Sequence, residues 1–169
     1  SATMIEPSLC NKLYKRELLY HSCLDRKIVN YEDLLRNFVL FQRAERTVYE
    51  DFCPYQYWRR ENSMSNNTEL ARQFKHILRA KEIIVDNSPN IYKDAAVRSF
   101  ISSLVNCANR LVFSKGKESR SLYSECRRKL IAEKKHLGLL LDRQKTAARL
   151  IILCPIIHKW VYRIYLKRK

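Results

Sequence analysis

The longest pattern in this chain is a helical repeat of apolar residues between positions 89 and 113. Apolar side chains recur there every three or four residues, which is the spacing of one face of an α-helix. These positions are Tyr92, Ala96, Val97, Phe100, Ile101, Leu104, Val105, Ala108, Leu111 and Val112. The pattern predicts one long helix that forms the central strut of a C-terminal helical bundle, ended by Lys115-Gly116.

Similar patterns predict the other helices of this bundle. One begins after Asn66, which with Glu69 has the spacing of an N-cap and N3 pair, ends near Val85 and is stopped by Asp86-Asn87-Ser88-Pro89. Another opens at Ser119 or Ser121, and Gly138 then marks a turn. The last covers residues 139–166 and is broken or kinked at Pro155, because proline cannot donate the helical hydrogen bond.

The first third of the chain shows shorter patterns. Residues 11–21 predict an amphipathic helix with Leu13, Leu18 and Leu19 facing inward. A second apolar helix is expected at residues 31–45. Aromatic and β-branched residues around Cys53-Pro54 then predict two short strands, or an extended arm, over residues 47–52 and 55–59.

Composition agrees with a helical fold. Only two glycines and four prolines occur in 169 residues, whereas an all-β protein needs turn residues every ten or so positions. The predicted fold class is mainly α: a helical bundle with a short two-stranded or extended aromatic arm near residues 47–59.

The chain is strongly basic, with 33 Lys and Arg against 17 Asp and Glu and a formal net charge of +16. Such a surface attracts nucleic acid, anionic lipid or phosphorylated substrates. The positive charges are spread over every predicted helix, whereas a nucleic-acid footprint would cluster them on one face. A nucleic-acid partner is therefore not favoured.

The six cysteines form no Cys-x-x-Cys pair and lie at no metal-ligand spacing from a histidine, so they predict no zinc site. Cys107, Cys126 and Cys154 fall on apolar helical faces, where a free thiol packs as a small hydrophobe. Free thiols are typical of the reducing cytoplasm, which is the expected location.

The C-terminal segment, residues 150–169, joins an apolar run to a mixture of Lys, Arg, Trp and Tyr. No stretch reaches the roughly 18–20 apolar residues of a membrane span. The mixture is typical of a helix at a lipid headgroup boundary, and it is equally compatible with a final core helix that carries a basic tail. In the first case the protein would rest on the inner face of the membrane.

Glu32 and Asp33 stand at the start of the second predicted helix. Carboxylates in a first helical turn interact favourably with the positive end of the helix dipole and so stabilise the helix. Alternatively, one of them faces a cleft and acts as a general base, because a helix start is a rigid support. The local pattern leaves both interpretations open.

Three motifs occur in order within sixty residues: the run from Asn11 to Leu18, then Tyr31-Glu32-Asp33, then Tyr55-x-Tyr57 followed by Arg60 and Ser63-Met64-Ser65. Together they resemble the C-terminal half of the family 2 glycosyltransferases, over about residues 7–66. These are inverting enzymes of the GT-A fold, common in bacterial capsule, exopolysaccharide and lipopolysaccharide assembly.

The resemblance implies roles for particular residues. Asp33 would be the general base that takes the proton of the acceptor hydroxyl, with Glu32 as its neighbour. The substrate-binding residues would be Arg60, Arg59, Tyr57, Tyr55 and Ser63. Arg60 is the first candidate for the leaving diphosphate, since a guanidinium matches phosphate oxygens bidentately. Many relatives have arginine directly after the second tyrosine, whereas this chain has Trp58 and then Arg59, so either arginine could point inward.

The family also has features that this chain lacks. Its members begin with a nucleotide-binding half that ends in an Asp-x-Asp element, which holds a divalent metal, Mg²⁺ or Mn²⁺. No Asp-x-Asp occurs here, so no metal ligand is assigned. We therefore expect the chain to be a fragment that is inactive alone.

Two domains are predicted: residues 1–66 as the acceptor-side end of the catalytic domain, and residues 67–169 as the helical bundle. In the full-length enzyme a sugar would pass from a nucleotide sugar to a polysaccharide or lipid-linked acceptor with inversion. The alternatives are a basic helical module that binds nucleic acid and one that binds a membrane surface.

Overall fold

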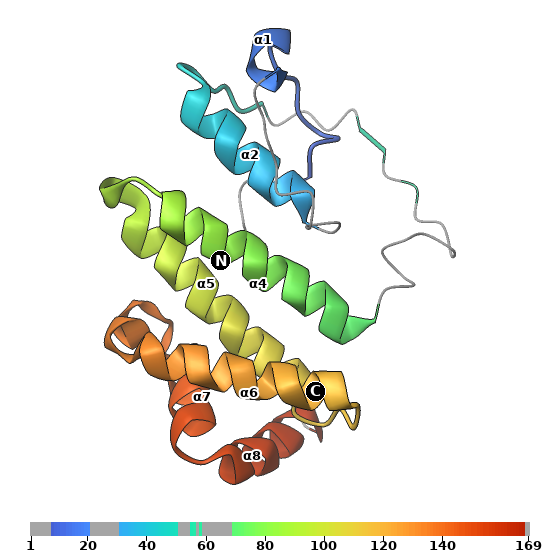
Figure 1. Cartoon of the computed structure of the whole chain (residues 1–169), viewed down its shortest axis with the longest axis vertical. Helices are drawn as coiled ribbons and strands as arrows, with labels where there is room; N and C mark the ends of the chain where they lie inside the picture. Colours follow the sequence, from blue (N-terminus) through green and yellow to red (C-terminus); the bar gives the residue numbers. More distant parts are fainter. Residues whose placement is uncertain (1–7, 21–30, 51–54, 57, 59–68, 168–169) are drawn as a thin grey trace. The chain divides into compact units, whose positions relative to one another are not determined.

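The computed structural model describes residues 8–20, 31–50, 55–56, 58 and 69–167, and in these ranges regular secondary structure is helical throughout (Figure 1). The chain divides into two compact units, Ser1–Glu69 and Leu70–Lys169. The expectation of a mainly helical protein is confirmed.

The second unit is a bundle built around one long helix. Helix α5 is the longest, and it packs against α4, α6 and α7. Figure 1 shows α5, in yellow-green, running between its neighbours. The elements are α4 (Leu70–Asn87), α5 (Asn90–Leu111), α6 (Lys117–Ala132), the 3-10 helix η1 (Lys134–Leu139), α7 (Asp142–Leu153) and α8 (Pro155–Lys167).

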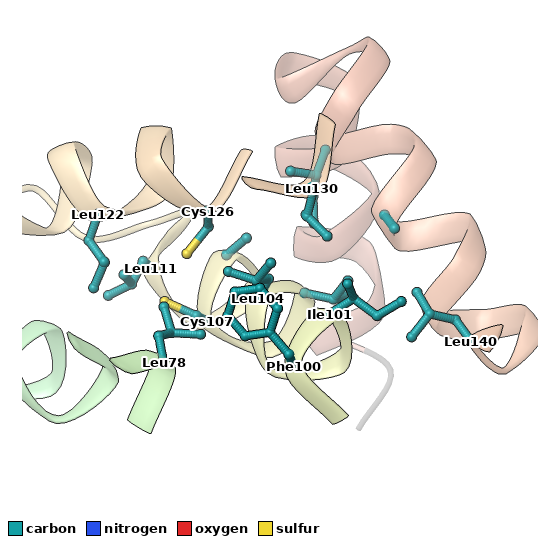
Figure 2. Packing of buried hydrophobic residues seen from close by; sticks show 14 of the residues in the cluster. Leu78, Phe100, Ile101, Leu104, Cys107, Leu111, Leu122, Cys126, Leu130 and Leu140 are labelled. Carbon is teal, nitrogen blue, oxygen red and sulfur yellow. The ribbon is translucent and has the colours of Figure 1, made fainter. Parts of the chain in front are cut away.

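The hydrophobic core of this unit is formed by one face of α5 and the helices around it. Ile101 and Leu104 are completely buried, as the pattern predicted (Figure 2). Cys107 and Cys126 also lie in this core, where a hydrogen bond between the two thiols, together with burial, raises the pKa of Cys107. Both thiols are therefore packing groups and are not reactive nucleophiles.

The helix boundaries follow the local chemistry. Asn90 begins α5 directly after Pro89, and a break at Cys154 separates α7 from α8, which starts at Pro155. One predicted boundary is wrong: α6 starts at Lys117, before Ser119 and Ser121, because the extended Gly116 already takes the N-cap position. Ser119 is instead buried inside the helix.

The first unit holds two described helices, α1 (Arg16–Leu19) and α2 (Glu32–Arg43). The prediction for α2 is confirmed to within two residues. The prediction of a helix over residues 11–21 is wrong, because only four of these residues are helical and none of those four is buried. Leu13 and Leu19, expected to face inward, are exposed. Without a packed apolar face, so short a helix gains little stability.

The two-stranded version of the aromatic arm is also wrong in the part of the chain that the structure describes. Residues 46–50, 55–56 and 58 belong to no strand or helix. Tyr49 and Trp58 are exposed, and so is Tyr55. A strand buries one face, and the described residues of the arm are exposed. The other half of the arm lies outside the described residues.

Helix α8 is joined to the bundle by a buried histidine. His158 is 2% exposed, and its Nε2 lies 2.8 Å from Oδ1 of Asn109 on α5. Because an amide oxygen can only accept, Nε2 carries the hydrogen, and Nδ1 accepts the hydroxyl of Tyr123 on α6 at 3.1 Å. Burial lowers the pKa of His158. The imidazole is thus neutral and connects three helices.

This histidine predicts a loss of stability in acid. Because the pKa of His158 is lower in the folded than in the unfolded chain, its contribution is complete above the unfolded value of about 6.5 and declines as the pH falls below it. We expect the free energy of unfolding to drop less between pH 7.5 and 5.5 in His158→Gln than in the wild type. Urea denaturation followed by circular dichroism measures this difference. An unchanged dependence in His158→Gln would contradict the assignment.

Candidate functional site

The candidate site lies at the start of α2, in the first unit. Glu32 and Asp33 occupy the first turn, and both are half-buried. The residue before them, Tyr31, has a φ of 71°, the only positive φ of a non-glycine residue in the described part of the chain. Such a backbone costs on the order of 1–3 kcal/mol and must be held by its surroundings. The chain therefore turns sharply into the helix at the predicted catalytic pair.

Asp33 is held by a distant part of the chain. Its Oδ2 accepts the backbone N–H of Leu9 at 3.2 Å, across 24 residues of sequence. One turn further along α2, the buried Asn37 accepts a hydrogen bond through Oδ1 from the hydroxyl of Tyr14. These two contacts fix the segment that contains Leu9 and Tyr14 against α2.

Tyr55 belongs to the same neighbourhood. Hydrogen bonds from the side chains of Ser8 and Tyr55 lower the pKa of the exposed Cys10 thiol, against an opposing influence of the Asp33 charge. The charge of Asp33 also acts on Tyr14, whose pKa is raised first by burial and second by this carboxylate. Asp33 and Tyr55, 22 positions apart, therefore both lie near enough to Cys10 to influence its pKa.

Counting only the described residues, the carboxylate of Asp33 keeps capacity for a further partner. An ionised carboxylate has two oxygens with about four acceptor positions, and the amide of Leu9 uses one of them. A hydroxyl within hydrogen-bond reach of the other positions could transfer its proton to this group. The arrangement can support acid–base chemistry, and it also stabilises the local fold.

The remaining predicted site residues, Arg59, Arg60, Tyr57 and Ser63, lie outside the described residues. Within the residues described, no group of three or more His, Cys, Asp and Glu side chains could hold a metal ion. The candidate site thus consists here of Asp33, Glu32 and Tyr55, with the residues that support them.

Sequence reasoning missed Cys10, Tyr14 and Asn37 as parts of this neighbourhood. Asn37 had a visible signal, because it is a polar residue on the apolar face of α2, one turn after Asp33. A buried amide needs a hydrogen-bond partner, which Tyr14 supplies. Nothing in the local pattern marked Cys10, whose surroundings are created by folding.

A second polar cluster lies in the bundle and is structural. A shallow hollow of about 180 Å³ between α4 and α6 is lined by charged side chains, among them Glu82, Glu125 and Lys129. Lys129 pairs with Glu125 at 2.9 Å and also with Glu82. Burial alone would lower the pKa of Lys129, but hydrogen bonds from its ammonium to Glu125 and Glu82 outweigh it, and the pKa is raised. The cluster therefore satisfies its own charges and joins two helices.

No family model, curated protein or solved structure matches this chain.

Proposed function

We propose that residues 7–66 form the acceptor-side end of the catalytic domain of an inverting, family 2-like glycosyltransferase. Asp33 is the general base, and Glu32 stands beside it in the same helical turn. The complete enzyme transfers a sugar from a nucleotide sugar to a polysaccharide or lipid-linked acceptor. Residues 67–169 form the C-terminal helical bundle of the same chain.

The observation that carries the proposal is that Asp33 and Tyr55 both influence the thiol of Cys10. In the sequence these two residues belong to separate motifs, and only the resemblance predicted that they share a site. The anchoring of Asp33 by the Leu9 amide adds to this, because a general base must be held in one position to act on a bound hydroxyl.

The chemistry assigns one task to each group. The acceptor hydroxyl attacks the anomeric carbon while the nucleoside diphosphate leaves from the opposite face, and Asp33 takes the hydroxyl proton. Arg60 or Arg59 stabilises the diphosphate as it departs. Tyr55, Tyr57 and Ser63 line the path of the substrates.

The divalent metal of such enzymes does not fit the described residues of this chain. They contain no cluster able to hold a cation, and the whole sequence lacks Asp-x-Asp. Mg²⁺ or Mn²⁺ would be bound by a nucleotide-binding half that this chain does not contain. No step assigned here to Asp33 depends on it.

A cytoplasmic location is part of the proposal. The described cysteines, Cys10, Cys107, Cys126 and Cys154, are all free thiols. Free thiols are typical of a reducing compartment, although they do not by themselves define it.

The test is a transfer assay on the full-length enzyme that the proposal implies. The chain, joined to its nucleotide-binding half, is incubated with UDP-, GDP- and dTDP-sugars, Mg²⁺ or Mn²⁺, and membrane lipid extract as a source of acceptors. We expect nucleoside diphosphate to be released from one nucleotide sugar only when acceptor is present. Absence of release from all three classes with both metals would contradict the proposal.

A further inference from the structure

Helix α8 carries apolar residues on two opposite faces. The inner face contacts the bundle through His158 and Tyr162. The outer face exposes a stripe of large apolar side chains at spacings of one, three and four residues, with Ile156 82% and Trp160 65% exposed. This outer stripe consists of Ile156, Ile157, Trp160 and Val161.

The orientation of α8 is set by the contacts of its inner face. Tyr162 stacks on Phe113 with ring centroids 6.2 Å apart, and His158 stacks on Tyr123 at 6.1 Å. The hydrogen bond from His158 to Asn109 adds a polar constraint. Turning the outer stripe inward would break all of these contacts, so the stripe is a fixed part of the folded surface.

The charge of α8 and of the segment that leads into it has one sign. Asp142 is the last acidic residue of the sequence, and the 27 positions that follow it carry eight basic residues: Arg143, Lys145, Arg149, Lys159, Arg163, Lys167, Arg168 and Lys169. Lys159 and Arg163 lie on α8 itself, one turn apart and along one side of the stripe, and both are exposed. The ammonium of Lys159 lies 6.0 Å from the centroid of the Phe113 ring, the same ring that stacks on Tyr162.

We propose that the outer face of α8 binds the surface of an anionic phospholipid bilayer, with the helix lying in the plane of the interface. Ile156, Ile157 and Val161 would enter the boundary between headgroups and acyl chains, to a depth of roughly 5–10 Å. Trp160 suits the same boundary, because its indole has an apolar body and a polar N–H. Lys159 and Arg163 would contact the lipid phosphates.

The charges favour lipid over the other partners of such a face. A second copy of the chain packed symmetrically on the stripe would bring Lys159 and Arg163 close to their own counterparts, and like charges repel. The phosphates of a nucleic acid would interact with the basic side chains, but Ile156 and Ile157 would have no apolar environment. An anionic bilayer provides both negative headgroups for the basic residues and an apolar layer for the outer stripe.

The inference is independent of the proposed transferase chemistry. It concerns only α8 and the basic residues near it, and its test measures binding without any turnover. A failure here leaves the role of Asp33 untouched, and an inactive Asp33 variant says nothing about α8.

The experiment is vesicle flotation with the full chain. Vesicles of phosphatidylcholine with 30% phosphatidylglycerol are compared with vesicles of phosphatidylcholine alone. In a Trp58→Phe background, Trp160 is the only tryptophan, so a blue shift of its emission reports insertion. We expect flotation and a blue shift with the anionic vesicles and at least tenfold weaker binding to the neutral ones.

Two pairs of variants separate the contributions. Ile156→Ser with Ile157→Ser should weaken binding at least about tenfold, whereas Ile91→Ser with Tyr92→Ser, at exposed apolar positions on α5, should leave it unchanged. Lys159→Glu with Arg163→Glu should weaken binding to anionic vesicles at least about tenfold. The control, Lys117→Glu with Arg120→Glu, changes two exposed basic residues on α6 and should weaken this binding far less. Circular dichroism checks that each variant is folded.

Three results would overturn the inference. The first is no flotation with anionic vesicles, or flotation that the α8 variants do not reduce. The second is a concentration-dependent dimer that the Ile156→Ser and Ile157→Ser changes abolish. The third is duplex DNA binding that survives 200 mM salt and requires Lys159 and Arg163, which would assign the face to nucleic acid.

Discussion

Replacing Asp33 with asparagine is expected to lower the rate of sugar transfer by the full-length enzyme about 10²–10⁴-fold, the usual contribution of a positioned general base. The amide keeps the shape of the side chain, and its oxygen can still accept the N–H of Leu9. It cannot take a proton from the acceptor hydroxyl near neutral pH. The turnover number at saturating substrate measures this change.

Two further variants serve as comparisons for the loss of turnover in Asp33→Asn. Glu45→Gln, an exposed position beyond the end of α2, should transfer sugar at the wild-type rate. Glu32→Gln should have a smaller effect than Asp33→Asn, because Glu32 is the neighbour of the base. Wild-type turnover in Asp33→Asn, with an unchanged circular dichroism spectrum, would show that this carboxylate serves only the fold.

Replacing Leu104 with alanine is expected to lower the free energy of unfolding of the bundle by about 3–5 kcal/mol. Leu104 is 0% exposed and lies among the side chains of the core in Figure 2. Removing its branched end deletes buried apolar surface and leaves a cavity that the packed neighbours fill only in part. Urea denaturation followed by circular dichroism at 222 nm measures the loss.

The matched control is Leu153→Ala, the same change at a position that is 79% exposed. It should alter the free energy of unfolding by less than about 0.5 kcal/mol. Equal losses in the two variants would contradict the core assignment. An intermediate loss in Leu104→Ala, with a changed dependence on urea, would indicate that the bundle does not unfold in a single step.

The sequence marked candidate site residues only where a signal was local. The Glu32-Asp33 pair was found because a helix start is readable from the residues on either side of it. Its surroundings were not found, since the contact of Asp33 with Leu9 joins residues 24 positions apart and uses a backbone N–H that no sequence pattern marks. Tyr55 was placed in the site by resemblance alone, and its hydrogen bond to Cys10 is a product of folding.

The prediction for residues 11–21 failed for a related reason. Leucines at helical spacing predict an inward face only if something packs against it, and here Leu13 and Leu19 stay exposed. The backbone is instead held by contacts to α2, which the hydrogen bond between Tyr14 and Asn37 represents. The spacing of apolar residues shows which side chains a helix could bury, but it does not show whether another element packs against them.

The residues alone were enough to define the bundle. A long apolar repeat, two prolines at helix starts and a scarcity of glycine are local properties, and they predicted α5, the break before α8 and the helical class. Tertiary packing decided the rest: which apolar face of α8 is covered, where Asp33 finds its hydrogen-bond donor, and that His158 is neutral. The physical reason is that helix formation depends on neighbours three or four residues apart, whereas burial and the state of a titratable group depend on residues far away in the chain.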